Sequence, residues 1–189
     1  MNTRVPLIGL LFVQLAIAYE WTMSGLTKIV RGAFPAGLAA ELRDKSDGAA
    51  GWYRSFLDSV VIPHGSAWGY TIELSELFVG LALLAGALLW LLRWDRLSAR
   101  GRSSVLLTIA TASLAGIFMA VNFHLANGAP HPWLIPKDGF DEGVDLDSLL
   151  PVIQLIIAGV SLVLWRAERR PAADEATAAL PPTVAPLVR

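Results

Sequence analysis

The feature that most constrains this chain is one long apolar stretch, Tyr70–Leu92, which carries two carboxylates in its first half and no charge in its second. Read as a helix at ~1.5 Å per residue, the segment from Trp68 to Trp94 is ~40 Å long, about the thickness of one bilayer with its headgroups. The carboxylates, Glu73 and Glu76, are three residues apart and share one helix face. Ionisable groups at membrane depth are costly, so they usually face the protein interior and often mark a functional site.

The composition is that of a membrane protein. Hydrophobic residues make up 54% of the chain and charged residues 16%, whereas soluble domains carry roughly 25% charged residues. We therefore expect an integral membrane protein in contact with the lipid bilayer. The net charge of -1 argues against a nucleic-acid partner. The chain has no cysteine, so it cannot carry a disulfide, a thiolate metal site or an iron–sulfur cluster. Any electron transfer would use a bound or diffusible cofactor, or take place on a partner subunit.

The apolar runs predict an all-α fold, an integral membrane four-helix bundle that occupies residues 1–170. The predicted spans are about 5–30, 67–92, 104–126 and 148–165. A cleaved signal peptide is an alternative for the first run, but the apolar pattern continues past a possible cleavage site at Ala16–Ala18, which favours a retained helix. The polar insert Arg31–Pro63 is expected to form an extracytoplasmic cap. The Ala/Pro-rich segment 171–189 is predicted to be a disordered cytoplasmic tail.

Basic residues are distributed unevenly among the segments that join the spans. Arginines gather at the N-terminus, between the second and third spans, and after the fourth, all on one side of a four-span protein. They are Arg4, Arg93, Arg96, Arg100, Arg102, Arg166, Arg169 and Arg170. Because short segments rich in lysine and arginine stay in the cytoplasm, both termini are predicted to be cytoplasmic and the insert to face outward.

Three short motifs resemble those of the DoxX/DoxD-like family of membrane proteins. Ser24–Ile29 resembles the family's sGxxKl motif, Glu76–Gly86 resembles its ElxxGlxLlxG helix, and Trp52–Leu57 lies where the family has an aromatic stretch. The resemblance covers Val5–Trp165, with a long insert after the first span. It implies a multi-pass protein of a prokaryotic plasma membrane that is linked to quinone oxidoreduction, such as the membrane subunit of thiosulfate:quinone oxidoreductase. The implied cofactor is a quinone, and the implied partner is another subunit or a second copy of the chain.

Polar residues of the first three spans are predicted to meet near the outer side of the bundle, because spans one and three run outward and span two inward. The predicted catalytic residues are Glu76, Glu73, His124 and Glu20, and the predicted cofactor-binding residues are Lys28, Asn122, Trp21 and Tyr70. A quinone site needs hydrogen-bond partners for two carbonyl oxygens, a route for protons and apolar walls. Histidine titrates near neutrality and suits proton delivery.

Other interpretations of the same residues remain open. The three glutamates could instead pair with Lys28, Arg31 or Arg54 and hold the bundle together. Metal binding is a third interpretation, but no Glu-x-x-His spacing, which is usual in di-metal bundles, occurs in the chain, and no metal site is predicted. The sequence therefore leaves the question of enzymatic activity open. A structural or assembly partner of another protein, or a carrier of small solutes or lipids, are the alternative functions.

Overall fold

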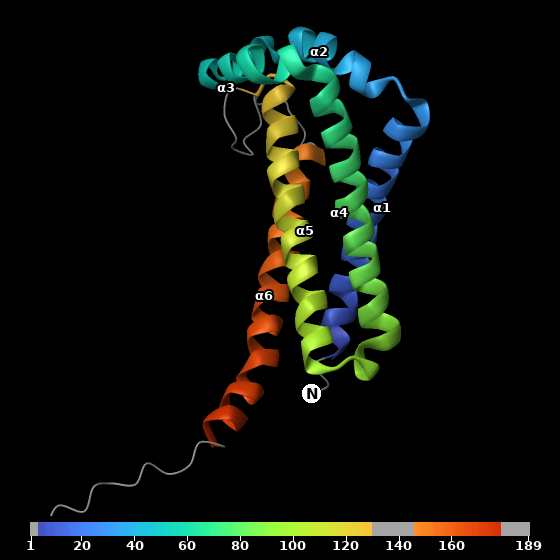
Figure 1. Ribbon diagram of the computed structural model, residues 1–189, viewed down its shortest axis with the longest axis vertical. Coiled ribbons are helices and arrows are strands. Elements are labelled where there is room, and N and C mark those ends of the chain that lie inside the picture. Colours follow the sequence, from blue (N-terminus) through green and yellow to red (C-terminus); the bar gives the residue numbers. More distant parts are fainter. Residues whose placement is uncertain (1–3, 130–145, 179–189) are drawn as a thin grey trace, which may run out of the picture.

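The computed structural model describes residues 4–129 and 146–178, and within these ranges every regular element is a helix. Four of the described helices are long and apolar enough to cross a membrane, which agrees with the predicted multi-pass membrane protein. They are α1 (Arg4–Arg31), α4 (Gly65–Arg93), α5 (Ala99–Ala126) and α6 (Leu146–Ala178). Figure 1 shows them running along the long axis of the molecule.

Two helix ends differ clearly from the predicted spans. Helix α5 begins at Ala99 rather than near residue 104, because the Ser98 side chain accepts a hydrogen bond from the Gly101 N–H at 3.2 Å and caps the helix. Helix α6 continues to Ala178, past the predicted end at residue 165 and into the segment predicted to be disordered. The rest of that segment, 179–189, lies outside the described residues, as does most of the Pro-rich loop before α6.

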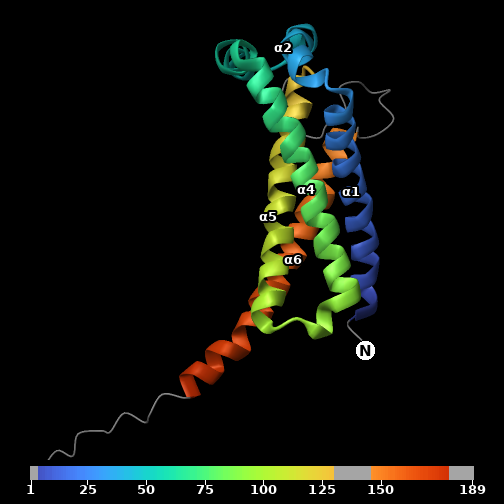
Figure 2. The ribbon, with the colours of Figure 1, turned by 45° about the vertical axis from the view of Figure 1, so that its right-hand side comes forward.

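The insert after α1 folds into short helices that lie across one end of the long ones (Figures 1 and 2). We call this segment, 34–64, the cap; it contains α2 (Phe34–Lys45), α3 (Gly51–Phe56) and short 3-10 and π-helical turns. Gly32, at a φ of 67°, ends α1 and turns the chain, and a proline stands in the first turn of α2. Apolar side chains of the cap form a small core with the end of α5. They are Leu38, Leu42, Tyr53, Leu57, Val61, Ile62 and Leu125.

One apolar row of the cap is exposed. Trp52 is 66% exposed, Phe56 36% and Val60 38%, while their neighbours Tyr53 and Leu57 are buried. This alternation follows from helical spacing, because residues four apart share one face of a helix. The cap therefore covers the long helices with one apolar face and presents a second apolar row to its surroundings.

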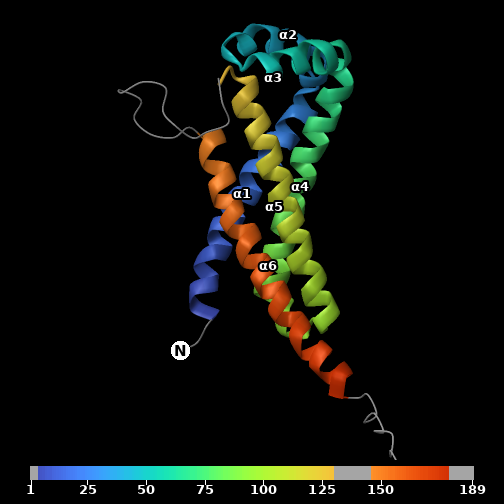
Figure 3. The same cartoon turned by 90° about the vertical axis from the view of Figure 1, so that its left-hand side faces the viewer.

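The long helices pack most extensively as two pairs, α1 with α4 and α5 with α6. Figure 3 shows the four helices from another side. Small residues allow the close approach in the first pair, as is usual for helices in lipid. A Cβ atom on Gly25 would lie 2.6 Å from the backbone nitrogen of Leu77, and Gly80 faces the backbone of Thr22. In the second pair, Gly116 of α5 faces the side chain of Gln154 on α6.

The outer faces of the long helices carry large apolar side chains. Phe12, Phe78, Phe118 and Leu155 are each more than half exposed. Each long helix thus has exposed apolar side chains. Such side chains suit contact with lipid tails, because the core of a bilayer is itself hydrocarbon.

Candidate functional site

A cavity of about 370 Å³ lies where the cap meets the ends of α1, α4 and α5. This volume is within the range of small-molecule sites in proteins, roughly 300–1,000 Å³. Most of its wall is apolar, and aromatic rings from five different elements take part. They are Trp21, Phe34, Tyr53, Phe56, Trp68, Phe118 and Phe123. The site is therefore a mainly hydrophobic chamber, and its few polar groups supply the hydrogen bonds and charges available there.

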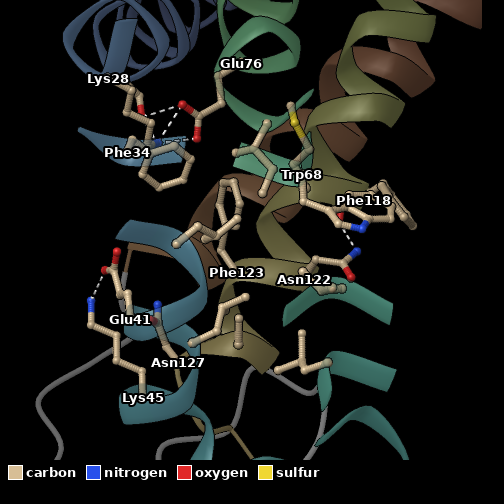
Figure 4. Close-up of a pocket in the computed structure, with 18 of the residues that line it drawn as sticks. Lys28, Phe34, Glu41, Lys45, Trp68, Glu76, Phe118, Asn122, Phe123 and Asn127 are labelled. Atoms are coloured by element: carbon tan, nitrogen blue, oxygen red, sulfur yellow. Dashed lines mark hydrogen bonds and ion pairs between the residues drawn. The ribbon is translucent and has the colours of Figure 1, made fainter. Parts of the chain in front are cut away.

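The principal polar group is a buried ion pair between α1 and α4. The Lys28 Nζ lies 2.5 Å from Glu76 Oε1 and 2.6 Å from Glu76 Oε2. Ser24 joins them: its hydroxyl accepts from Lys28 at 2.9 Å and donates to Glu76 Oε2 at 3.1 Å. The Glu76 side chain has no exposed surface, whereas that of Lys28 is 25% exposed. All three residues line the cavity, and Figure 4 shows Lys28 and Glu76 facing each other.

Local sequence and helix packing together produce this pair. Ser24 and Lys28 are four residues apart, so they share one face of α1. Gly25, on the neighbouring position, brings the backbone of α1 against that of α4 near Leu77, next to Glu76. The ammonium group also lies 5.0 Å from the ring centroid of Phe34 and 5.7 Å from that of Phe123. Cation–π attraction to these rings further stabilises a charge with limited access to water.

A second polar contact joins the cap to α5. The Tyr53 hydroxyl lies 3.0 Å from the backbone oxygen of Asn122 and 3.1 Å from its Oδ1, and it can donate to either. The Asn122 amide nitrogen in turn donates to the Phe118 carbonyl at 2.7 Å. Asn122, predicted to bind a cofactor, lines the cavity, but its amide is already engaged in holding the cap on α5. Sequence reasoning did not single out Tyr53 as its partner.

A third polar group stands at the edge of the cavity. Lys45 Nζ and Glu41 Oε1 of α2 lie 2.7 Å apart, and their side chains are about half exposed. Neither residue was predicted as part of the site, although a Glu–Lys spacing of four on one helix is a recognisable signal for such a pair. The close-up in Figure 4 shows this pair well apart from Trp68 and Phe118, which lie near each other.

The structure brings five of the eight predicted site residues to the cavity: Glu20, Trp21, Lys28, Glu76 and Asn122. Trp21 is 3% exposed, and its indole nitrogen has no hydrogen-bond partner among the described residues. The indole nitrogen itself has almost no accessible surface, so it is a buried donor, unpaired in the described chain, rather than one exposed in the cavity.

The other three predicted residues do not line this cavity. Glu73 is 5% exposed and lies on the same helix as Glu76, but its Oε2 is buried without a hydrogen-bond partner in the described chain. His124 is partly buried near the end of α5, and Tyr70 is 59% exposed. Of the polar residues predicted to meet near the outer side, Glu20, Glu76 and Asn122 thus line the cavity, whereas Glu73 and His124 do not.

Among residues 7–129 and 149–169, whose side chains the structure describes, no group of three or more His, Asp or Glu is placed to hold a metal ion. The polar groups at the cavity therefore include the Lys28–Glu76 pair, the Ser24 hydroxyl, the Glu20 carboxylate, the Tyr53–Asn122 contact and the Glu41–Lys45 pair. Such a set can donate hydrogen bonds to ligand oxygens and can exchange a proton. Comparison with protein-family models, with curated proteins and with solved structures gives no match for this chain.

Proposed function

We propose that this chain is the membrane subunit of a quinone-linked oxidoreductase of the DoxX/DoxD-like kind, and that the cavity receives a quinone headgroup. The observation that carries the proposal is the Lys28–Glu76 pair, which lies inside an aromatic-walled cavity at the membrane end of the cap. Both residues belong to the two motifs that resemble the family, Ser24–Ile29 and Glu76–Gly86. Two sequence motifs 48 residues apart thus contribute to one site.

The residues around the cavity fit the needs of a quinone ring. Trp21, Phe34 and Phe123 provide apolar walls, and the Lys28 ammonium lies 5.0 and 5.7 Å from the ring centroids of Phe34 and Phe123. Lys28 makes two bonds to Glu76 and one to Ser24. It can exchange one carboxylate bond for a bond to a ligand carbonyl oxygen and keep the ion pair with the other. Desolvated charged donors of this kind form stronger hydrogen bonds than neutral ones.

A quinone supplies two-electron redox chemistry, since it takes up two electrons and two protons to become a quinol. We assign the electrons to a donor group on a partner subunit, because this chain has no cysteine ligands for an iron–sulfur cluster. The part of this chain is to bind and orient the ring and to hold protons. Lys28 and Glu76 form a hydrogen-bonded pair that can pass a proton, and Glu41 and Lys45 lie at the solvent-accessible edge.

We further propose that the four long helices form a bundle in a prokaryotic plasma membrane, with the cap outside and both termini in the cytoplasm. The support is the arginine pattern: Arg93, Arg96, Arg100 and Arg102 follow the end of α4 that is farthest from the cap. Reporter fusions at Ser98 test this orientation. A reporter at Ser98 that is active only outside the cell would reverse it.

A structural or assembly role is the second candidate, and one observation favours it. Lys28, Glu76 and Ser24 satisfy one another without any ligand, as a purely structural anchor between α1 and α4 would. In that case the cap would be the surface that another membrane or extracytoplasmic protein recognises.

Purification in a mild detergent, followed by mass spectrometry of bound lipids and proteins, separates the two functions. A stoichiometric quinone supports the redox subunit, and a protein partner without quinone supports the assembly role. The variant Lys28→Met/Glu76→Leu, which removes both charges together, should remain folded and lose the quinone. The matched control is Arg102→Met/Glu168→Leu, which removes an ion pair of 2.8 Å at the other end of the molecule and should retain it.

A further inference from the structure

The cavity reaches two different parts of the molecular surface. One rim is aromatic: Phe118 of α5 is 70% exposed, Trp68 of α4 and Phe56 of α3 are each 36% exposed, and all three line the cavity. The other rim is charged and consists of Glu41 and Lys45 of α2, with side chains 47% and 51% exposed. Figure 4 shows Trp68 and Phe118 together on one side and the Glu41–Lys45 pair on another. The Lys28–Glu76 pair is part of the same chamber.

Two residues of the aromatic rim, Trp68 and Phe118, lie on candidate membrane-spanning helices, whereas Phe56 belongs to the cap. Phe118 precedes the cap end of α5, Ala126, by two helical turns, a distance of about 12 Å at 1.5 Å per residue. It belongs to the candidate span Ala99–Ala126, so its exposed ring faces the surroundings of that span rather than the cap. Helices α4 and α5 also pack less extensively on each other than α1 on α4 or α5 on α6. Trp68 and Phe118, which lie near each other in Figure 4, therefore place exposed aromatic surface of the cavity lining between α4 and α5.

We propose that the ligand of this cavity is a quinone with a long apolar tail, which enters sideways from the leaflet nearest the cap. Its ring lies by Lys28 and Glu76, and its tail leaves past Trp68 and Phe118 into the lipid. This inference rests on the proposed function and adds the class of quinone and its route. A water-soluble ligand would need only the charged rim, whereas exposed aromatic rings on candidate membrane-spanning helices suit a tail that stays in hydrocarbon. Water and protons then reach the cavity through the charged rim.

A photocrosslinking experiment on the full chain in phosphatidylcholine/phosphatidylglycerol vesicles tests this route. Phe118 and Phe78 are replaced, one at a time, by the photoreactive analogue p-benzoylphenylalanine. They are a matched pair, since both are phenylalanines on long helices, 70% and 71% exposed, but only Phe118 lines the cavity. A third variant carries the analogue at Glu41. The probes are decylubiquinone, which has a tail, and duroquinone, which has the ring alone.

We expect a saturable decylubiquinone adduct through its tail at position 118, only background at position 78, and no tail adduct at position 41. Equal adducts at 118 and 78, a tail adduct at 41, or a phospholipid adduct at 118 that decylubiquinone does not displace would each overturn the route. Binding of duroquinone without binding of decylubiquinone would overturn the route and leave the proposed function standing. Failure of both quinones to shift the thermal unfolding of the unmodified protein would remove the proposed function and this inference together.

Discussion

Replacing Lys28 alone should destabilise the protein far more than replacing Lys28 and Glu76 together. Glu76 is fully buried, and Lys28 makes two of its three hydrogen bonds, at 2.5 and 2.6 Å, while Ser24 makes the third at 3.1 Å. In Lys28→Met the buried carboxylate keeps only one neutral partner. Removing one member of a buried pair costs about 3–5 kcal/mol, whereas replacing both by apolar residues is often neutral or stabilises by about 1–4 kcal/mol.

The measurement is a double-mutant cycle with Lys28→Met, Glu76→Leu and the double variant, followed by reversible unfolding in mixed detergent micelles. The coupling free energy should be about 3 kcal/mol or more, because each single variant leaves the other charge uncompensated. The control cycle on Arg102 and Glu168, whose side chains are 28% and 24% exposed, should give about 1 kcal/mol or less.

The reasoning fails if the effects of Lys28→Met and Glu76→Leu add to within about 0.5 kcal/mol, the tolerance for independent sites. Such additivity would mean that the two side chains do not form a buried pair and that α1 packs on α4 in another register. Quinone binding measured on the double variant gives a separate answer. A folded double variant that still binds quinone with unchanged affinity would leave the pair as a structural anchor only.

Three further predictions concern other parts of the structure. Gly25→Ala should lower the free energy of unfolding by about 1–3 kcal/mol, because the added methyl group overpacks against α4. The control Gly9→Ala lies on the same helix and has no atom within 4 Å of the new Cβ, so it should be neutral or stabilising. Equal effects of the two variants in the unfolding assay would contradict the close α1–α4 approach. Gln154→Leu should stabilise by about 1–3 kcal/mol, since both amide atoms of this fully buried side chain lack partners among the described residues; a loss of stability would reveal a partner for the amide. Tyr53→Phe should cost about 0.5–1.5 kcal/mol by removing the hydroxyl that holds the cap on α5, and unchanged hydrogen exchange in the cap would count against that role.

Much of the fold could be predicted from the sequence because membrane spans depend on local properties. Length and hydropathy alone identify α1, α4, α5 and α6. Helix ends were less accurate, since the start of α5 depends on one side-chain cap at Ser98. The orientation in the membrane and the relation to the DoxX/DoxD-like family stay predictions from the arginines and the motifs.

Length and hydropathy alone predict that Glu73 and Glu76 lie inside one long apolar helix, where two ionisable groups require polar partners. Which glutamate meets Lys28, 48 residues away, depends on how α1 and α4 cross, and that is a property of the folded molecule. The crossing is set by the close approach at Gly25 and Gly80, a property of two surfaces rather than of either helix. It puts Glu76 in the cavity beside Lys28 and leaves Glu73 buried outside it, although helical periodicity alone treats the two carboxylates as equals.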